Sequence, residues 1–258
     1  MFPIADTVTL EGVKIARLSL DGLLDTAAAA ASGEVSGGAV FMYANIHTMN
    51  LAKKDPVYRE MLFRADLVYC DGVGVVLGAR VAGIRIPGRL TAADFIDDLC
   101  HRFTDEGRSI FILGGEPGVA KRAAEILEAR CPGLRVAGTH HGYFKRTGEE
   151  NEAVVDMIAE KKPDCLFVGM GSPSQEAWVL SHRERLGAPL AWCVGATFDF
   201  VVGKVHRAPS WMRRFHLEWF HRFLMEPRRM FFRYAVGNPS FLLRMVGLRL
   251  KARKKDAS

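Results

Sequence analysis

Six short apolar runs alternate with stretches that have the periodicity of amphipathic helices, and this alternation constrains the fold more than any other feature of the sequence. The runs are AVFMYAN, DLVYCD, SIFILGG, LRVAGTH, DCLFVGMG and LAWCVGA, and helical stretches such as residues 118–131 and 149–162 separate them. Strands that are apolar throughout are typical of a parallel sheet buried on both faces. The sequence therefore predicts an α/β fold, a Rossmann-like parallel sheet with helices on both faces.

The start of the chain and the ends of the runs complete this outline. VTLEGVKIARLS is a short strand-like opening, and the alanine-rich segment from Leu23 is expected to be helical. In open parallel sheets, ligands bind beyond the carboxyl ends of the strands, so the residues after each run are the candidates for a site. These residues are polar or glycine-rich: Asn45, Asp71–Gly72, Gly114–Gly115, His140–Gly142, Gly169–Gln175 and Gly195.

Composition is that of an ordinary folded chain, with 49% hydrophobic and 25% charged residues among 258. The five cysteines are far apart, without a C-x-x-C pair or a His/Cys cluster at zinc-ligand spacing, so they are expected to be reduced core residues. The first residues lack the basic and apolar regions of an export signal. A cytoplasmic protein is expected.

The positive charge is concentrated at the C-terminal end. Residues 201–258 hold 14 Lys and Arg against three acidic residues, a net charge of +11, whereas the rest of the chain has a net charge of −5. From Pro209 onward, large aromatic residues recur at helical spacing among arginines. We therefore predict a catalytic body over residues 1–205 and a basic, aromatic, helical appendage over residues 206–258.

The appendage is expected to lie on a membrane without crossing it. No uncharged apolar run reaches the roughly 18 residues of a membrane-spanning helix, and a basic amphipathic helix suits the surface of an anionic bilayer. Nucleic acid is an alternative partner for a basic chain, but no helix-turn-helix, RNP or zinc-finger pattern occurs. The sequence thus favours phospholipid head groups or a lipid diphosphate over nucleic acid, and a non-enzymatic lipid or nucleic-acid binder is kept as an alternative.

Asp71 follows the second apolar run and precedes the glycine pattern Gly72-x-Gly74-x-x-x-Gly78. This pattern is close to a dinucleotide-binding fingerprint but has the wrong last interval, so it supports a nicotinamide-dependent oxidoreductase only as an alternative. Spacing alone favours Asp71 as the N-cap of the following helix. A general base is the second interpretation, and spacing does not decide between the two.

Two further motifs begin helices. GGEPGVAKR places Gly114 and Gly115 at a strand end and Pro117 at the expected first helical turn, which would leave backbone amides for a phosphate or ribose. GSPSQEAW predicts Ser172 as an N-cap, Pro173 at the first helical position and Gln175 closing a capping box.

Metal-binding patterns are missing from the sequence. His140 and His141 have no cysteine or carboxylate partner at metal spacing, which favours loop hydrogen bonding for them. No D-x-D pair occurs, so the sequence does not encode a divalent ion held between sugar-nucleotide phosphates and two aspartates. Neither a metal nor another cofactor is predicted.

Seven blocks, in order, resemble the WecG/TagA/CpsF family of bacterial glycosyltransferases between about Ala39 and Arg229. The blocks are AN at Asn45, KDPVYREMLFRADLVYCDGVGVV, FILGGEPGVAKRAAEIL, GTHHGYF, PDCLFVGMGSPSQEAW, GATFDFVVGKVHRAPSWM and LEWFHRFLMEPRR. The resemblance implies an inverting, metal-independent transferase. It would move a sugar from a UDP-sugar donor to a polyprenyl-diphosphate-linked sugar acceptor at the cytoplasmic face of the membrane, in the synthesis of a surface polysaccharide.

The resemblance also implies roles for particular residues. Asp71, in DGVGVV, corresponds to the family's catalytic aspartate and becomes the expected general base. Arg89 is expected to stabilise charge on the departing UDP. Contacts with substrate are expected from Asn45, Tyr43, Gly72, Gly114, Gly115 and Gln175, and contacts with the lipid diphosphate or membrane from Arg207, Arg213, Arg214, Arg228 and Arg229.

Two departures from the family pattern bear on the donor sugar. Tyr43 stands where many members have threonine, and IRIPGRLTAADF differs from the common form of its block. Three donor sugars are therefore kept as alternatives: N-acetylmannosaminyl, N-acetylmannosaminuronyl and glucosyl. The resemblance makes a homodimer reasonable, and it gives no role to His140 and His141.

Overall fold

A six-stranded parallel sheet forms the centre of the computed structural model, which describes residues 6–33, 37–205, 209, 212, 218–225 and 231–256. The strand order is β4-β3-β8-β7-β5-β6, and every neighbouring pair is parallel. The six predicted apolar runs are confirmed as its strands. They are β3 (Ala39–Ala44), β4 (Leu67–Cys70), β5 (Ser109–Gly114), β6 (Arg135–His140), β7 (Cys165–Gly169) and β8 (Leu190–Cys193).

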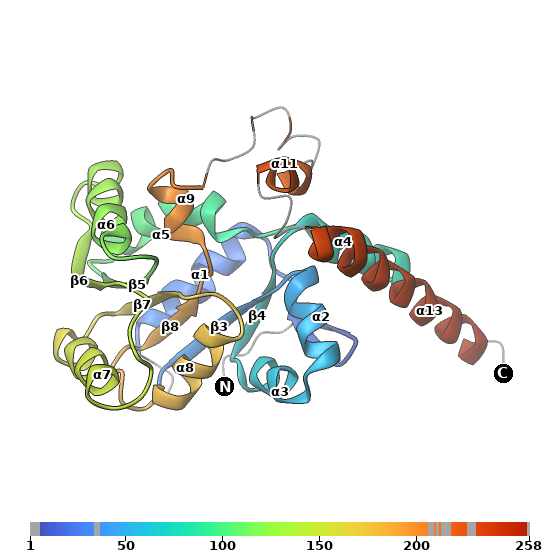
Figure 1. Ribbon diagram of the computed structural model, residues 1–258, viewed down its shortest axis with the longest axis horizontal. Helices are drawn as coiled ribbons and strands as arrows, with labels where there is room; N and C mark the ends of the chain where they lie inside the picture. Colours follow the sequence, from blue (N-terminus) through green and yellow to red (C-terminus); the bar gives the residue numbers. More distant parts are fainter. Residues whose placement is uncertain are drawn as a thin grey trace.

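Helices cover both faces of this sheet, as predicted (Figure 1). One face packs against α1 (Leu20–Ala31), α5 (Ala92–Asp105), α6 (Val119–Arg130) and α9 (Thr197–Val201). The other packs against α2 (Ile46–Lys54), α3 (Pro56–Arg64), α4 (Val73–Ala82), α7 (Glu149–Lys161) and α8 (Ser174–His182). Helix α1 begins one turn before the predicted Leu23, because Ser19 caps it by accepting a hydrogen bond from the amide of Gly22 at 3.1 Å.

The strand side chains alternate between two apolar layers. Val40 and Met42 of β3 point into the layer beneath α2, whereas Phe41, between them, points to the opposite layer. There the indole of Trp192 lies 5.2 Å, centroid to centroid, from the Phe41 ring and 5.8 Å from the Tyr69 ring. Large buried aromatic rings therefore join the central strands β3, β4 and β8 into one rigid unit.

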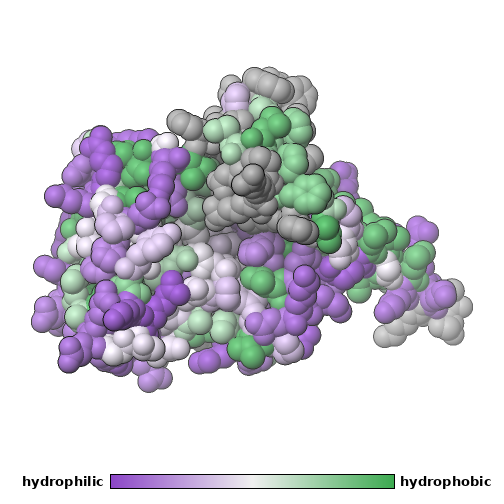
Figure 2. Space-filling model, viewed as in Figure 1, coloured by the Kyte–Doolittle hydropathy of each residue, from purple (hydrophilic) through white to green (hydrophobic). Residues whose placement is uncertain are grey.

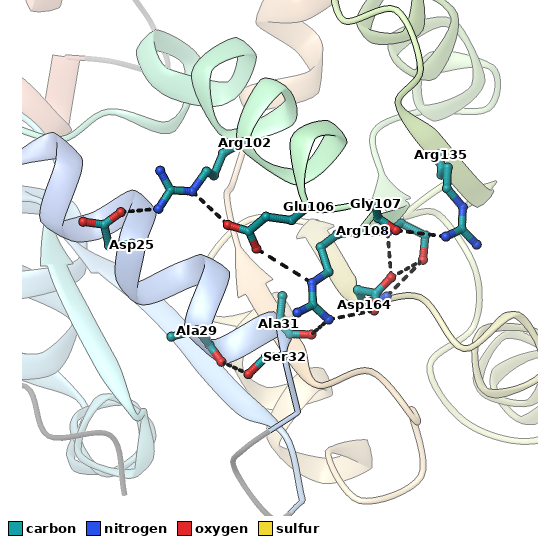
Figure 3. Close-up of polar contacts among 11 residues, drawn as sticks. Asp25, Ala29, Ala31, Ser32, Arg102, Glu106, Gly107, Arg108, Arg135 and Asp164 are labelled. Atoms are coloured by element: carbon teal, nitrogen blue, oxygen red, sulfur yellow. Dashed lines mark hydrogen bonds and ion pairs between the residues drawn. The ribbon is translucent and has the colours of Figure 1, made fainter.

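Two aspartates fix the strands at the amino edge of the sheet. Asp66 accepts a hydrogen bond from the amide of Val40 at 2.8 Å, and Asp164 accepts from both the amide and the hydroxyl of Ser109 at 2.7 Å. Figure 3 shows Arg108 between the carboxylates of Glu106 and Asp164, with a hydrogen bond to the carbonyl of Ala31 at the end of α1. These contacts hold neighbouring strands in register, so their opposite ends stay aligned at the carboxyl edge.

The strand-like opening forms a hairpin outside the main sheet. β1 (Thr7–Leu10) pairs antiparallel with β2 (Val13–Ala16). The turn residues Glu11 and Gly12 have φ values of 50° and 85°, the left-handed conformation that two-residue hairpin turns require. The sequence predicted strand structure here but not the turn that divides it.

The C-terminal part contains α11 (Glu218–Met225), a π-helix η1 (Phe232–Gly237) and α13 (Asn238–Asp256). The guanidinium of Arg244 in α13 makes a bidentate ion pair with Glu11, with distances of 2.8 and 3.0 Å. Arg244 also donates to the side-chain oxygen of Asn50 at 2.8 Å. These bonds tie α13 to the hairpin and to α2, while its far end extends from the body (Figure 1). The domain boundary at 205/206 stays a prediction.

Gly74 and Gly78 allow two helices to approach α4 closely. A methyl group added at Gly78 would stand 2.9 Å from Phe241 Cζ and 3.0 Å from Met245 Cγ of α13, and one at Gly74 would stand 2.8 Å from Ile46 Cγ1 of α2. Phe241 and Met245 are both buried. Helix packing therefore accounts for the last two glycines of the pattern that resembled a dinucleotide fingerprint.

Replacing Gly78 by alanine should destabilise the protein, because the new methyl group would overpack the contact with Phe241. We expect a loss of about 1–3 kcal/mol in the free energy of unfolding, measured with urea. The matched control is Gly247→Ala in α13, where nothing lies within 4 Å of the added methyl. There the better helix propensity of alanine should add about 0.5–1 kcal/mol. Equal effects of the two substitutions would contradict this packing role.

Candidate functional site

The candidate site begins where β3 and β4 end side by side. Ala44 pairs with Cys70, so the next residues of the two strands, Asn45 and Asp71, are neighbours at the carboxyl edge. The side-chain amide nitrogen of Asn45 donates to Asp71 Oδ2 at 3.2 Å, and the backbone amide of Asp71 donates to the carbonyl of Ala44 at 2.9 Å. Two residues that are 26 positions apart in sequence thus form one polar pair.

A capping box fixes the orientation of the Asn45 amide. Asn45 is the N-cap of α2, and its side-chain oxygen accepts from the amide of Thr48 at 3.1 Å while the Thr48 hydroxyl accepts from the amide of Asn45 at 2.8 Å. Because the oxygen is used by Thr48, the nitrogen of the same amide must face Asp71. The arrangement holds the carboxylate in one orientation.

Asp71 is partly exposed and does not occupy the N-cap position of α4. Gly72 does, with φ of 91°, and no side-chain capping bond is present. The spacing-based prediction of an N-cap at Asp71 is therefore wrong, because the chain needs one further residue, a glycine with positive φ, to turn into the helix. Burial, reinforced by the neighbouring Asp71 carboxylate, raises the pKa of the Cys70 thiol to about 12.

Arg89 belongs to the loop between α4 and α5. The amide of Leu90 donates to the carbonyl of Cys70 at 2.8 Å, which brings this loop to the end of β4. Arg89 precedes Leu90 and Asp71 follows Cys70, so this backbone hydrogen bond brings the backbones of Arg89 and Asp71 close together. The guanidinium of Arg89 is partly buried and lies 3.2 Å from a carboxylate oxygen of Asp94, which stands at the start of α5.

Tyr43 and Gln175, which are 132 positions apart in sequence, meet beside the Asn45–Asp71 pair. Gln175 Nε2 donates to the Tyr43 hydroxyl at 3.4 Å, and Gln175 Oε1 accepts from the amide of Gly195 at 3.1 Å. Gln175 is fully buried, and its nitrogen also donates to Glu176 Oε1 at 3.0 Å. The predicted contact of Gln175 with substrate stays a prediction, since the nitrogen and the oxygen of its side-chain amide are both hydrogen-bonded inside the protein.

The predicted capping box of GSPSQEAW is wrong. Helix α8 begins at Ser174, its N-cap is Pro173, and no side chain caps it. The Ser172 hydroxyl instead donates to Glu176 Oε1 at 2.7 Å. A serine that bonds to the side chain of a buried glutamate is not available to cap the helix.

The loops after β5, β6 and β7 come together at Gly114 and Gly115. A methyl group at Gly114, where φ is 156°, would stand 2.5 Å from the carbonyl oxygen of Gly169. The amide of Gly115 donates to that same carbonyl at 3.2 Å. Gly115 therefore does not offer a free amide to a phosphate, and helix α6 begins at Val119, two residues after the predicted Pro117.

His140 makes the loop hydrogen bond that the sequence favoured. Its Nδ1 lies 2.8 Å from the carbonyl oxygen of His141, and the two imidazole rings are 4.4 Å apart. Within the described residues, no group of three His, Cys, Asp or Glu side chains is arranged to hold a metal ion. The five cysteines are buried and free, as predicted.

Five predicted residues cannot be placed. Arg207, Arg213, Arg214, Arg228 and Arg229 lie outside the described residues. Sequence reasoning also missed three residues of the hydrogen-bonded network beside the site, namely Tyr58, Ser172 and Glu176. The bonds from Tyr58 to Glu176 and between Tyr43 and Ser172 join segments more than 100 residues apart. A glutamate in the first turn of a helix is also usually exposed.

Comparison with known proteins gives a consistent assignment. The family model described as Glycosyl transferase WecG/TagA/CpsF family matches residues 8–255. Relatives in Bacillus spizizenii, Bacillus subtilis and Staphylococcus aureus strain MW2 are each named N-acetylglucosaminyldiphosphoundecaprenol N-acetyl-beta-D-mannosaminyltransferase. The two Bacillus proteins are 33% and 31% identical over 192 residues, covering 74% of this chain and 73% of theirs. The staphylococcal protein is 31% identical over 187 residues, covering 72% of each.

The family match extends over almost the whole chain and includes Asn45, Asp71, Arg89 and Gln175, which the fold gathers at the carboxyl edge or beside it. The predicted resemblance is confirmed. The chain belongs to the WecG/TagA/CpsF family of glycosyltransferases.

Proposed function

We propose that this protein transfers a sugar from a UDP-sugar donor to a polyprenyl-diphosphate-linked sugar acceptor. The Asn45–Asp71 pair carries the proposal, because it presents an oriented, partly exposed carboxylate at the edge where parallel sheets bind ligands. The names of the relatives, which specify an N-acetylglucosaminyl-diphosphoundecaprenol acceptor, support this acceptor class. N-acetylmannosaminyl is accordingly the first donor to test, beside N-acetylmannosaminuronyl and glucosyl donors.

In the proposed reaction, Asp71 is the general base. Its carboxylate accepts the proton of the acceptor hydroxyl while that oxygen attacks the anomeric carbon, and the bond from the anomeric carbon to the UDP oxygen breaks with the electron pair leaving on UDP. A single displacement inverts the configuration at the anomeric carbon.

Arg89 is proposed to stabilise the negative charge that develops on the departing UDP. The hydrogen bond between Leu90 and Cys70 brings the loop that carries Arg89 to the end of β4, and its guanidinium supplies a positive charge with several N–H donors, the role proposed here in place of a divalent ion. We therefore propose a metal-independent reaction. The arginines at 207, 213, 214, 228 and 229 are proposed to bind the lipid diphosphate.

The C-terminal helices are proposed to hold the protein at the cytoplasmic face of the membrane. Figure 2 shows apolar side chains gathered over the region of α11 and along α13. Leu243 and Leu250 of α13 are 72% and 55% exposed, and Leu224 and Met225 of α11 are each 59% exposed. Within the described residues, no helix is long and apolar enough to span a bilayer. Exposed leucines beside basic residues suit the surface of an anionic bilayer.

The alternatives have less support. The glycine pattern behind the oxidoreductase hypothesis is accounted for by the packing of Gly74 and Gly78. A non-enzymatic lipid or nucleic-acid binder would not need the polar network at the carboxyl edge of the sheet. A homodimer remains a prediction.

Asp71→Asn should abolish most turnover while the fold and UDP binding are retained, because the amide cannot accept the proton. We expect kcat to fall by about 100- to 10,000-fold, with the dissociation constant for UDP changed by less than about twofold. Turnover is measured as UDP release, and binding by calorimetry. The control is Asp105→Asn, which makes the same chemical change at an exposed site. Near-normal turnover of the Asp71 variant would exclude the general-base role.

Release of UDP should require both one donor and the lipid-linked acceptor, and it should continue in EDTA. The full-length protein is assayed against a panel of UDP-sugars, with and without a short polyprenyl-diphosphate-linked N-acetylglucosamine. Anomeric configuration of the product, determined by NMR, tests inversion. Loss of activity in EDTA with recovery on adding Mg²⁺ or Mn²⁺ would contradict the metal-independent mechanism.

Leu243→Glu combined with Leu250→Glu should weaken binding to vesicles that contain phosphatidylglycerol, because two apolar anchors become charged. We expect the partition coefficient to fall by at least about tenfold in a vesicle sedimentation assay. The control is Val57→Glu in α3, which replaces an apolar side chain that is 64% exposed on the body. Equal partitioning of all three proteins would place the membrane contact elsewhere.

A further inference from the structure

Glu176 is a fully buried carboxyl group next to the candidate site, and it takes no part in the proposed proton transfer. It lies in the first turn of α8, and its side chain receives three hydrogen bonds, all at Oε1. The donors are the Ser172 hydroxyl at 2.7 Å, Gln175 Nε2 at 3.0 Å and the Tyr58 hydroxyl at 3.4 Å. Oε2 is also buried and has no hydrogen-bond partner in the part of the chain that the structure describes.

The direction of each hydrogen bond in this network follows from Glu176. Ser172 uses its single proton to donate to Glu176, so its oxygen is left to accept from the Tyr43 hydroxyl, 3.3 Å away. The Tyr43 oxygen in turn accepts from Gln175 Nε2 at 3.4 Å. The proton of Tyr43 is thereby committed to Ser172, and its phenol is held in one orientation.

The same acceptor determines the orientation of the Gln175 amide. Because Glu176 and Tyr43 both require a donor, the Gln175 nitrogen must face them and its oxygen must face the amide of Gly195. Gly195 follows β8, Tyr43 is in β3 and Ser172 follows β7, so the network joins the ends of three adjacent strands. A methyl group added at Gly195 would stand 2.8 Å from the Tyr43 hydroxyl, which shows how tightly these ends pack.

The surroundings of Glu176 favour an uncharged carboxyl group. The groups that face it are hydroxyls, an amide and the thiol of Cys193, and within the described residues no lysine, arginine or histidine pairs with it. Burial raises the pKa of the Glu176 carboxyl, although the hydrogen bonds from Ser172 and Gln175 oppose this shift. An unpaired buried charge costs more than one unsatisfied polar atom, so the burial of Glu176 disfavours the ionised form of its carboxyl group.

We propose that Glu176 is a positioning residue whose Oε1, acting as a hydrogen-bond acceptor, fixes Tyr43 and Gln175 beside the Asn45–Asp71 pair and so shapes the substrate site. This inference rests on the proposed glycosyl transfer, because it assigns Tyr43 to that substrate site. Tyr43 lies two residues before Asn45 and is partly exposed, so its orientation affects the space available to a sugar at the end of β3. Glu176 itself is too deeply buried to touch the substrate.

The test compares Glu176→Gln with Glu176→Leu by steady-state kinetics. Glutamine keeps a neutral acceptor at Oε1, so kcat and KM for the donor should stay within about twofold of the wild type. Leucine keeps the volume but removes the acceptor, so KM should rise by about tenfold, the effect expected from losing one or two hydrogen bonds, with a smaller change in kcat. Unchanged kinetics in the leucine variant, or equal losses in both variants, would overturn the proposal.

A double-mutant cycle separates positioning from general packing. Tyr43→Phe removes the hydroxyl at the end of the network. We expect the double variant, Glu176→Leu with Tyr43→Phe, to show the same rise in KM as the single variant Glu176→Leu. Effects on KM that multiply would mean that Glu176 does not act through Tyr43. If the leucine variant does not fold, Ser172→Ala replaces it in the cycle, because it breaks the same chain.

Failure of this inference can be told from failure of the proposed function. An active wild type whose KM is indifferent to Glu176→Leu and Ser172→Ala overturns the inference alone. A wild type that releases no UDP with any donor and acceptor pair overturns the proposed function and the inference that rests on it.

Discussion

The pairing of β3 with β4 on one side and β8 on the other is the constraint on which the site depends. Parallel pairing forces the carboxyl ends of these strands to the same edge, and the register Ala44↔Cys70 makes Asn45 and Asp71 neighbours. Asp66 supports the pairing of β3 with β4 at the opposite edge, where it accepts from the amide of Val40, and Asp164 supports the pairing of β5 with β7 in the same way through Ser109. A slip in this register would separate the polar pair without changing any residue of it.

The sheet must be covered on both faces for its apolar strands to be buried, and this need also explains the position of α13. Phe241 and Met245 complete the apolar layer above Gly78, and the ion pair between Arg244 and Glu11 ties the helix to the N-terminal hairpin. The first turns of α13 are thus part of the folded body. Leu248 and Arg249 still contact the body, Arg249 beside Gly83, and the end of the helix beyond them extends away from it (Figure 1).

Much of this architecture could be predicted from the sequence, because it depends on local patterns. Continuous apolar runs specify buried parallel strands, and helical periodicity specifies the crossovers between them. The gathering of Asn45 and Asp71 also followed, since parallel topology alone brings strand ends together. Two predictions of helix starts failed: Ser172 bonds to the buried Glu176 instead of capping α8, and Gly72, with its positive φ, takes the N-cap position expected for Asp71.

The buried network could not be predicted for a related reason. Glu176 follows Gln175 in a segment that reads as an ordinary helix start, and nothing local shows that its side chain is fully buried. Tyr58, which donates to Glu176, comes from α3, and Tyr43, which bonds to Ser172, comes from β3, both more than 100 residues earlier in the chain. Only the assembled fold reveals that one carboxyl oxygen receives three donors.

This network has a consequence for how the chain can change in evolution. The Tyr43 hydroxyl can donate only while Ser172 accepts, and Ser172 accepts only while its own proton is donated to Glu176. The nitrogen of the Gln175 amide faces Tyr43 only while the oxygen of the same amide accepts from the backbone amide of Gly195. A substitution at any one of these positions therefore alters the value of the residues at the others. Under the proposed role of Tyr43, replacing it to change the accepted sugar should succeed more often when Tyr43, Ser172, Gln175 and Glu176 are varied together than when Tyr43 is varied alone.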